Sequence, residues 1–490
     1  MHPGPLDDRA AWHRHGFDGE AADLVVPGSL PRAWVARWAE APGEPVLRDT
    51  DTGWLTAAEL EARTAEAAAR LAGAGVEPGD RVLMSCPPSA DLVIAHVGAL
   101  RLGAIVVPVN TAFGPNELAN VWSEARPALA VLDDPARLPQ APSRRVSLDG
   151  PRASVPALDQ CGPDDPAMLM FTSGTTGRPK GAILTHGSAL ASAQGVRIAW
   201  RWTPEDRLVL TLPLFHMHGL GVGVHGTLLT GASMAIAPFS VDGALDLASA
   251  ERATLFFGVP TMYVRFATSP RVGELAALRL CVSGSAALAA DVWRVLAELG
   301  GQRVIERYGM TETFMNTSNP HDGDRRPGSV GFPLPGVELR LGDNDEICVR
   351  GPNVLRAYWE RPDATADAFR DTWFLTGDIG EFDDDGYLRI VGRSKDLIIT
   401  GGFNVYPREI EELLAEHPAV AEAAVAGEPS DEWGETVVAY VVAADTVTES
   451  ELLEWCGERL AKYKRPRHVR FLDTLPRNAL GKVVKSELKP

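Results

Sequence analysis

Cysteine is scarce in this chain of 490 residues, which contains only five. Cys86, Cys161, Cys281, Cys348 and Cys456 are widely separated, and none of them belongs to a CxxC pair. The sequence therefore gives no sign of a disulfide framework or of a zinc site built on cysteine.

Long apolar runs are also missing. The N-terminal residues lack the apolar core of a signal peptide. The longest apolar region, residues 92–109, is interrupted by His96, Arg101, Gly103 and Pro108. It predicts a helix followed by a short strand, because a membrane-spanning helix needs about 20 consecutive apolar residues. We therefore expect a cytoplasmic protein with no membrane partner.

Positive charge is in deficit, since 47 Lys and Arg residues face 65 Asp and Glu residues and the net charge is −18. This balance disfavours nucleic acid or an anionic membrane surface as a partner. It does not disfavour a nucleotide, which is bound by local charge rather than by net charge. A chain of 490 residues is longer than one hydrophobic core supports, so we expect two or three domains.

The most informative stretch is residues 171–180, where hydroxyl residues, glycines and a lysine follow an apolar run that predicts a buried strand. Glycines let a loop bend and bring backbone N–H groups close to a ligand, and a lysine adds a positive charge to that anion-binding concavity. It is not a Walker loop, because Gly181 follows the lysine. The alternative is a flexible surface loop, but we expect a polyphosphate site made by Thr172, Ser173, Gly174, Thr175, Thr176, Gly177 and Lys180.

An α/β rhythm runs through much of the chain. Such alternation of strand and helix predicts parallel sheets. Short β segments follow from Asp345, and a compact tail with strand and helix signals begins after Arg393. We expect an α/β fold: a large N-terminal domain (residues 1–393) of parallel-sheet subdomains plus a β-rich subdomain, and a small mobile α+β C-terminal domain (residues 394–490). The predicted apolar strands lie near residues 81–85, 105–109, 129–132, 208–212, 254–257, 278–283 and 303–306.

Polar and glycine-rich segments follow several of these strands. They are residues 172–174, 213–216, 258–261, 283–286 and 308–312. In open α/β sheets, ligands bind beyond the carboxyl ends of the strands. The sequence therefore predicts one site at which these segments converge.

Six segments match the motifs of a known family, and they do so in the family's order. They read TSGTTGRPK at 172–180, YGMTE at 308–312, TGD at 376–378, GRSK at 392–395, GGFNVYPRE at 401–409 and GK at 481–482. On these motifs the chain resembles, over nearly its whole length, the adenylate-forming superfamily of acyl-CoA synthetases, luciferases and peptide-synthetase adenylation domains.

The resemblance implies a reaction in two steps. A carboxylate attacks the α-phosphate of ATP and gives an acyl-adenylate and pyrophosphate, and a thiol, usually that of coenzyme A, then displaces AMP. It also implies that Mg²⁺ is required, and that the C-terminal domain rotates between the steps about a hinge at Lys395.

The resemblance assigns catalytic roles to four residues, Lys482, His216, Thr311 and Glu312. Lys482 would place a cation where the attacking carboxylate and the phosphate develop charge. Glu312, with Thr176, would hold Mg²⁺, which takes one or two carboxylates together with phosphate oxygens and waters. Thr311 would hydrogen-bond the α-phosphate, and His216 would lie between the acyl pocket and the pantetheine tunnel. The alternatives are a solvated surface lysine for Lys482 and a salt-bridge partner for Glu312.

The remaining motif residues are expected to bind the nucleotide and coenzyme A. Tyr308 would stack on adenine or, alternatively, be a core aromatic, and Asp378 would accept both ribose hydroxyls. The resemblance adds further ATP or AMP contacts from Arg393, Ser285, Glu306 and Arg307. Gly401, Gly402 and Phe403 would line the pantetheine tunnel. A basic cluster would either meet the CoA phosphates or solvate a helix end; it comprises Lys462, Lys464, Arg465 and Arg467.

The acid is expected to be small and to carry a second carboxylate. A helix predicted to begin at Pro260 flanks the acyl pocket in the family, and Arg265 lies about one turn inside it. An arginine near that pocket is costly unless paired, and a substrate carboxylate is a bidentate partner for it. Residues 212–220, 257–265, 282–288 and 303–317 resemble malonyl- and methylmalonyl-CoA synthetases. On that basis the acid contacts would be Arg265, His216, Ser285 and Met310.

Other interpretations stay open. Residues 1–41 do not clearly resemble the malonyl subgroup, so the acid could be another, bulkier one from a specialised pathway. The acyl group could pass to the thiol of a carrier protein acting in trans. A luciferase-like role rests on fold analogy alone. A nucleotide-binding regulator without turnover is disfavoured, because Lys482 and Glu312 are both present.

Overall fold

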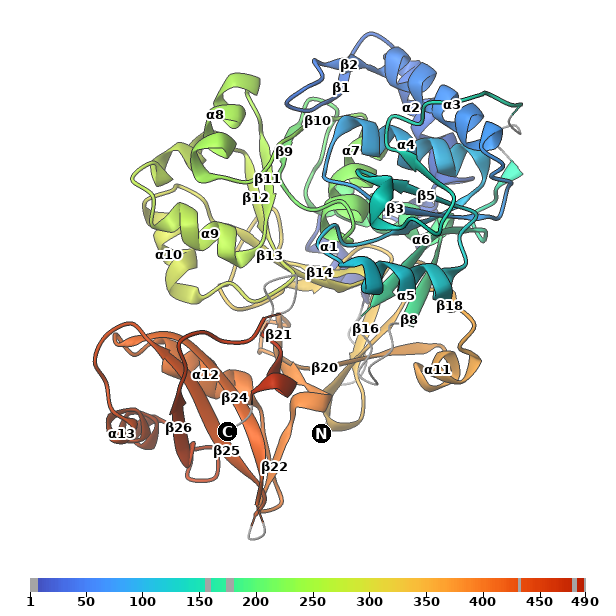
Figure 1. The fold of residues 1–490 in the computed structure, drawn as a ribbon. Helices are drawn as coiled ribbons and strands as arrows, with labels where there is room; N and C mark the ends of the chain where they lie inside the picture. The colour runs from blue at the N-terminus through green and yellow to red at the C-terminus, as the bar shows by residue number, and fades with distance from the viewer. Residues whose placement is uncertain (1–7, 155–159, 173–179, 431–432, 478–482, 489–490) are drawn as a thin grey trace. The chain divides into compact units, whose positions relative to one another are not determined.

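The computed structural model describes residues 8–154, 160–172, 180–430, 433–477 and 483–488 (Figure 1). It divides into two compact units. The first unit contains Met1–Arg340 and Val349–Phe374, and the second contains Leu341–Cys348 and Leu375–Pro490. The domain boundary that the sequence predicts at Ser394 stays a prediction.

A seven-stranded sheet in the first unit has the order β18-β8-β7-β4-β3-β5-β6. Strands β3, β4, β5, β6 and β7 are parallel to one another. Strand β8 is antiparallel to β7, and β18 is antiparallel to β8. The strands β3, β4 and β5 are almost completely buried, as expected for apolar strands covered on both faces. The strand bounds are β3 (Arg81–Ser85), β4 (Ile105–Pro108), β5 (Leu129–Leu132), β6 (Ser143–Arg145), β7 (Pro166–Thr172), β8 (Lys180–Thr185) and β18 (Ala357–Tyr358).

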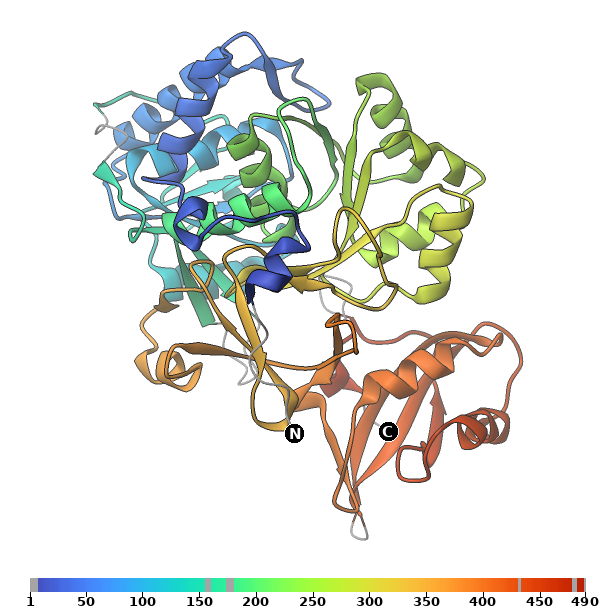
Figure 2. The same cartoon turned by 180° about the vertical axis from the view of Figure 1, so that it is seen from behind.

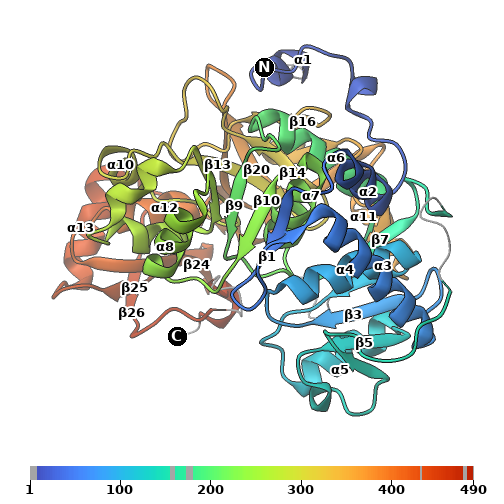
Figure 3. The ribbon, with the colours of Figure 1, turned by 90° about the horizontal axis from the view of Figure 1, so that it is seen from above.

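Helices cover both faces of this sheet. Helices α3 (Ala57–Gly73) and α4 (Ala90–Leu102) lie on one side of β3 and β5, and α5 (Pro115–Ala125) lies on the other (Figure 3). Helix α3 begins at a capping box in which Thr56 accepts from the Glu59 N–H and Glu59 accepts from the Thr56 N–H, which satisfies two helix-end donors. Other helices of the first unit are α1 (Asp8–His13), α2 (Leu30–Glu40), α6 (His186–Ala199), α7 (His225–Thr230) and α11 (Pro362–Asp367).

A nine-stranded sheet, also in the first unit, has the order β15-β14-β13-β12-β11-β9-β10-β1-β2. The strands from β13 to β1 are parallel, which confirms the parallel α/β fold that the sequence predicts. The strand bounds are β1 (Pro45–Arg48), β2 (Leu55–Thr56), β9 (Arg207–Leu210), β10 (Ser233–Ile236), β11 (Leu255–Gly258), β12 (Leu280–Ser283), β13 (Ile305–Met310), β14 (Phe314–Ser318) and β15 (Phe332–Pro333).

Three helices pack on one face of strands β9 to β13, and Figure 2 shows this layer from behind. They are α8 (Val241–Glu251), α9 (Pro260–Ala267) and α10 (Ala290–Glu298). Phe256, Tyr263, Phe266 and Leu296 form the centre of their shared core. Helix α9 begins at Pro260, as predicted, because proline suits the first turn of a helix.

The second unit has its own apolar core. Its C-terminal sheet has the order β23-β22-β25-β24, with β26 beside β25. Ile410, Leu414, Val441 and Leu452 are fully buried between this sheet and its helices. The remaining strands and helices are β16 (Glu338–Leu341), β17 (Glu346–Arg350), β19 (Phe369–Arg370), β20 (Trp373–Phe382), β21 (Leu388–Arg393), β22 (Ile398–Thr400), β23 (Phe403–Val405), β24 (Val420–Ser430), β25 (Gly434–Ala443), β26 (His468–Phe471), α12 (Pro407–Ala415) and α13 (Glu449–Arg459). None of the helices described is both long enough and apolar enough to cross a membrane.

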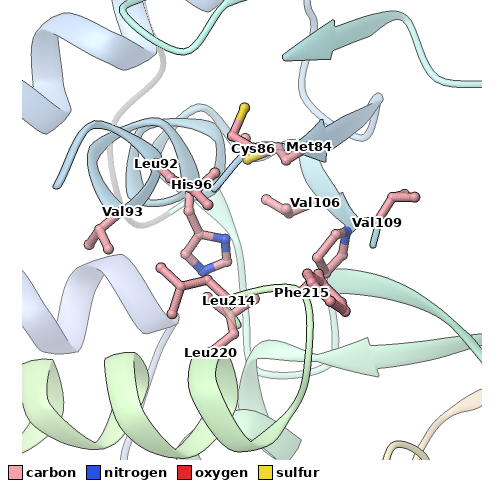
Figure 4. Close-up of a pocket in the computed structure, with 11 residues that line it drawn as sticks. Met84, Cys86, Leu92, Val93, His96, Val106, Val109, Leu214, Phe215 and Leu220 are labelled. Carbon is pink, nitrogen blue, oxygen red and sulfur yellow. The ribbon is translucent and has the colours of Figure 1, made fainter. Parts of the chain in front are cut away.

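The core of the first unit contains several buried histidines. His96 and His225 are hydrogen-bonded through their Nε2 atoms, which are 2.9 Å apart. His96 also lines an apolar cavity of about 10 Å³ with Met84, Cys86 and Phe215 (Figure 4). A cavity of this volume holds about one water molecule, so it is too small for an acyl group.

Burial sets the charge state of these histidines. It lowers the pKa of His15 and of His186 to about 4, and that of His96 to about 3. Burial also holds the pKa values of His218 and His225 well below the ordinary value for histidine. All five side chains are therefore neutral in the folded protein at neutral pH.

We expect the free energy of unfolding to fall as the pH is lowered from about 6.5 towards 5. In this range the unfolded chain binds protons on these histidines and the folded chain does not, so each histidine lowers the stability by up to about 1.4 kcal/mol per pH unit. Calorimetric melting between pH 7.5 and 5 measures the effect. His15→Gln should reduce the slope. A melting temperature that is constant over this range would contradict the expectation.

Candidate active site

The carboxyl ends of neighbouring parallel strands bring most of the predicted acyl and nucleotide residues of the first unit to one edge. Strands β9, β11, β12 and β13 are adjacent and parallel. His216 follows β9, Pro260 follows β11, Ser285 follows β12, and Met310 ends β13. This arrangement agrees with the predicted convergence of the strand ends.

The YGMTE motif lies on a β-hairpin. Strand β13 ends at Met310, residues 311–313 form a turn, and β14 begins at Phe314, which is paired with Met310. Gly309 permits this geometry, because a Cβ atom on it would lie 1.9 Å from the Phe314 carbonyl oxygen. Tyr308, on the same strand, is 7% exposed. The hairpin presents Thr311 and Glu312 at its tip.

Glu312 is the buried carboxylate of this tip, with 6% of its surface exposed. Its Oε1 atom accepts a hydrogen bond from the Tyr358 hydroxyl at 3.0 Å and one from Thr172 Oγ1 at 3.4 Å. Thr172 ends β7 and is paired with Lys180 at the start of β8, so the two ends of the phosphate-loop motif meet there. Lys180 Nζ lies 5.4 Å from the centre of the Tyr358 ring.

Arg307 is buried on β13, with 4% of its surface exposed. A Cβ atom on Gly284 would lie 2.3 Å from Arg307 Cζ, so the missing side chain at Gly284 is what makes room for the guanidinium. Burial lowers the pKa of Arg307 to about 9. Nε and Nη2 have no hydrogen-bond partner among the described residues. Burying a cation without a partner is costly, so these two donors are available to an anionic or strongly polar ligand.

Two histidines, His216 and His218, follow strand β9, and His218 lies near the charge of Arg307. His218 is 4% exposed, its ring stacks on Phe257, and neither ring nitrogen has a partner in the described part of the chain. Burial and the nearby charge of Arg307 hold the pKa of His218 well below its ordinary value. Burial lowers the pKa of His216 to about 4, so both rings are neutral at pH 7.

Three predicted residues have their own local surroundings. The Glu306 carboxylate accepts from the N–H groups of Leu288 and Gly328, at 3.3 Å and 2.8 Å, and so anchors two loops. Ser285 has a φ of 74°, a strained conformation for a residue with a side chain. Arg265 is exposed on α9, with its guanidinium 6.0 Å from the centre of the Phe239 ring.

The second unit holds the predicted ribose residues as a pair. Asp378 on β20 is directly opposite Arg393 on β21, and Arg393 Nε lies 2.9 Å from Asp378 Oδ1. Asp378 is 4% exposed, whereas Arg393 is more exposed. The hinge candidate Lys395 is exposed in a short 3₁₀ helix, Ser394–Asp396.

The predicted CoA residues form a tight hairpin in the second unit. Gly401 and Gly402 connect β22 to β23 with φ values of 56° and 81°. Phe403 is 54% exposed, and its ring stacks on Tyr463 with the centres 4.7 Å apart. Lys464, which follows Tyr463 and belongs to the predicted basic cluster, forms an ion pair with Glu409.

Several predicted residues lie outside the described part of the chain. They are Ser173, Gly174, Thr175, Thr176, Gly177 and Lys482. Among the described residues, no group of three or more His, Cys, Asp and Glu side chains is arranged to hold a metal ion. A cation near Glu312 would therefore depend on phosphate oxygens and water for its other ligands.

Known proteins share this architecture and these motifs. The family model for AMP-binding enzymes matches residues 34–359, and the model for the AMP-binding enzyme C-terminal domain matches residues 409–482. The chain belongs to the AMP-binding enzyme family.

Similar proteins include ligases for different acids. The chain is 37% identical to feruloyl-CoA synthase from Amycolatopsis sp, over 93% of this chain and 98% of that protein. It is 34% identical to malonate–CoA ligase from Arabidopsis thaliana, over 85% of this chain and 79% of that protein. The structure of ATP-bound MatB from Rhodopseudomonas palustris superimposes with a TM-score of 0.88 at 39% identity, covering 94% of this chain and 98% of that one.

The chain is an AMP-forming acyl-CoA ligase. It joins a carboxylic acid to coenzyme A with ATP, through an acyl-adenylate. The predicted fold class and enzyme class are therefore confirmed, whereas the roles of individual residues stay predictions.

Sequence reasoning missed two side chains of this site. Tyr358 reaches Glu312 across 46 residues of sequence, and only the fold brings the two together. His218, two residues after His216, is more deeply buried than His216. The glycine that follows it, within a π-helical turn at His218–Val224, is a signal for close packing.

We expect Gly309→Ala to disrupt the hairpin that carries Thr311 and Glu312. The new methyl group would overlap the Phe314 carbonyl, so the backbone must open at a cost of about 1–3 kcal/mol. Thermal melting and ATP-dependent pyrophosphate release measure the two consequences, a lower melting temperature and a large loss of kcat/KM. Gly53→Ala is the matched control, because a Cβ atom there meets open space. Equal behaviour of the two variants would contradict the expectation.

Proposed function

We propose that the acid is a small dicarboxylate of the size of malonate or methylmalonate, which the enzyme joins to coenzyme A. The observation that carries this proposal is the buried guanidinium of Arg307, whose Nε and Nη2 lack partners among the described residues. A second carboxylate on the substrate would complete both donors as a charged bidentate pair. The similarity to malonate–CoA ligase and to MatB supports the same class of acid.

The two arginines would have different roles in this proposal. The sequence predicts Arg265 as the acid-binding residue and Arg307 as a nucleotide contact. Arg307, however, is buried over Gly284 at the end of β12, whereas Arg265 is exposed beside Phe239. We infer that Arg307 holds the distal carboxylate and that the exposed Arg265 contributes less to acid binding, because solvent screens its charge.

The residues around Glu312 suit a hard cation. A buried carboxylate held by two hydroxyl donors, with no further acidic cluster in the described residues, matches a Mg²⁺ ion completed by phosphate oxygens and water. When bound, Mg²⁺ neutralises charge on the triphosphate and so favours the departure of pyrophosphate. Thr176, the other predicted ligand, lies outside the described residues.

The chain's own groups would then perform the two steps. Thr311 would donate to the α-phosphate, Asp378 would accept from the ribose hydroxyls, and Lys482 would stabilise the charge that develops as the acid's carboxylate attacks. The α-phosphate bond to pyrophosphate breaks as the bond to the carboxylate forms. In the second step the CoA thiol, after losing its proton to solvent, would attack the acyl carbon, and the bond from that carbon to AMP would break as the thioester forms. His216, whose ring is neutral at pH 7, is predicted to lie between the acyl group and the thiol.

A second candidate is a ligase for a bulkier acid. The 37% identity to feruloyl-CoA synthase favours an aromatic acid instead of a dicarboxylate. Arg307 would then meet a polar substituent on the acid or the nucleotide, as the sequence predicts. Transfer to a carrier-protein thiol in trans is a third possibility that changes the acceptor and leaves the adenylation site the same.

A panel of acids separates these candidates. We expect CoA-dependent pyrophosphate release with Mg-ATP to be confined to malonate and methylmalonate, tested beside acetate, butyrate, succinate, benzoate, ferulate and a long-chain acid. Turnover with ferulate or benzoate would favour the bulkier acid. Turnover with monocarboxylic acids only would keep the enzyme class and discard the dicarboxylate. Pyrophosphate release without thioester formation would favour a carrier-protein acceptor.

Arg307→Met tests the arginine itself. We expect kcat/KM for malonate to fall about 100-fold or more, because removing one member of a buried charge pair costs roughly 2–5 kcal/mol. The free variant should nevertheless be more stable than the wild type, since a buried, unpaired cation is replaced by an apolar side chain. Thermal melting and kinetics with malonate and ATP measure both effects. Unchanged malonate kinetics would exclude Arg307 as the carboxylate site.

Arg265→Ala separates the two arginines. We expect it to raise KM for malonate by less than Arg307→Met does, with the ATP affinity unchanged. Arg294→Ala is the matched control, because Arg294 is also exposed and forms an ion pair with Asp291 in the described part of the chain. A complete loss of malonate use in Arg265→Ala, with Arg307→Met active, would reverse the two assignments.

A further inference from the structure

A short segment, residues 353–359, joins the two sheets of the first unit at the active site, and we call it the brace. On one side it pairs with β8 of the seven-stranded sheet, where Tyr358 is opposite Ala182 and the Trp359 N–H donates to the Gly181 carbonyl at 2.7 Å. On the other side the Leu355 N–H donates to the Glu312 carbonyl at 2.6 Å, at the tip of the β13–β14 hairpin.

Asn353 fixes the other end of the brace to the same hairpin. Its side chain is 1% exposed, and its Nδ2 atom donates to the Thr313 carbonyl at 2.6 Å. The brace therefore holds the hairpin tip by backbone and side-chain bonds at once. It also begins its pairing with β8 only a few residues beyond Lys180, so it connects the phosphate-loop base to the tip that carries Glu312.

Tyr358 is the brace residue that contacts a charged group on each side. Its hydroxyl donates to Glu312 Oε1 at 3.0 Å, and its ring faces Lys180 Nζ at 5.4 Å from the ring centre. A donor on one carboxylate oxygen restricts rotation of that carboxylate.

We propose that Tyr358 is a positioning residue that orients the Glu312 carboxylate towards the metal on the nucleotide phosphates. This inference rests on the proposed role of Glu312 as the Mg²⁺ ligand. It goes beyond that role, because it places the determinant of metal affinity on a residue of the brace that touches neither the metal nor the substrate. Second contacts of this kind typically change metal affinity by about 10- to 100-fold.

Tyr358→Phe removes only the hydroxyl and keeps the ring over Lys180. The matched control is Tyr440→Phe, because the Tyr440 hydroxyl also donates to a glutamate, Glu428, at 2.6 Å in the second unit. Glu312→Gln is the reference for loss of the ligand itself. Thr172→Val is a second test variant, since it removes the longer bond to the same Oε1 atom.

Metal affinity is measured directly, without turnover. Mn²⁺ binding in the presence of α,β-methylene-ATP is followed by the electron paramagnetic resonance signal of free Mn²⁺, and no acid is needed. We expect the Mn²⁺ concentration for half-saturation to rise about tenfold in Tyr358→Phe, less in Thr172→Val, more in Glu312→Gln, and not at all in Tyr440→Phe.

Kinetics give the second measurement. In Tyr358→Phe, the Mg²⁺ concentration for half-maximal pyrophosphate release should rise by about the same factor as the Mn²⁺ concentration for half-saturation. The rate of thioester formation from supplied acyl-adenylate and coenzyme A should stay within about twofold of wild type, because the positioning effect is confined to the metal-dependent step. Wild-type metal binding in Tyr358→Phe, with a shifted Glu312→Gln, would overturn the positioning role alone. Wild-type binding in Glu312→Gln would overturn the metal assignment and this inference with it. Neither outcome depends on which acid is the substrate.

Discussion

The candidate active site of the first unit depends on the contact between the brace and the hairpin, which includes the hydrogen bond from the Leu355 N–H to the Glu312 carbonyl. It is the point at which the brace from the seven-stranded sheet meets the hairpin from the nine-stranded sheet. Gly309 lets the hairpin close, and Asn353 holds the residues after its tip. Thr172 and Glu312 belong to different sheets, and this contact, together with the hydrogen bond between their own side chains, fixes their separation.

Near this contact the fold buries a negative and a positive side chain, Glu312 and Arg307. Glu312 is stabilised by hydroxyl donors, so its carboxylate remains oriented when no ligand is bound. Arg307 receives no such compensation from the described residues, and its pKa falls accordingly. Burying an unpaired cation costs several kcal/mol that a structural role does not return. A role in binding an anionic ligand would account for this cost. The many surface arginines differ from Arg307, because they pair with carboxylates of the protein.

The sequence predicts the strands well because their burial is continuous. Residues 81–85 match β3 at both ends, since four consecutive buried residues follow Arg81 and leave an unbroken pattern. It does not predict β14, where Asn316 and Thr317 are polar but fully buried, because their burial follows from the hairpin and not from their character. The contact from Tyr358 to Glu312 and the packing of Arg307 on Gly284 are equally hidden, since each joins residues far apart in the chain.

Relatives at 37% and 34% identity carry the names of different acids, so overall similarity does not decide the substrate. The residues predicted to bind ATP lie on strand ends and turns whose geometry the fold sets. A larger residue at position 284 would exclude the Arg307 guanidinium, because a Cβ atom there would lie 2.3 Å from Cζ. As proposed above, the buried Arg307 would bind a second negative charge on the acid, and an aromatic monoacid would leave this cation unpaired.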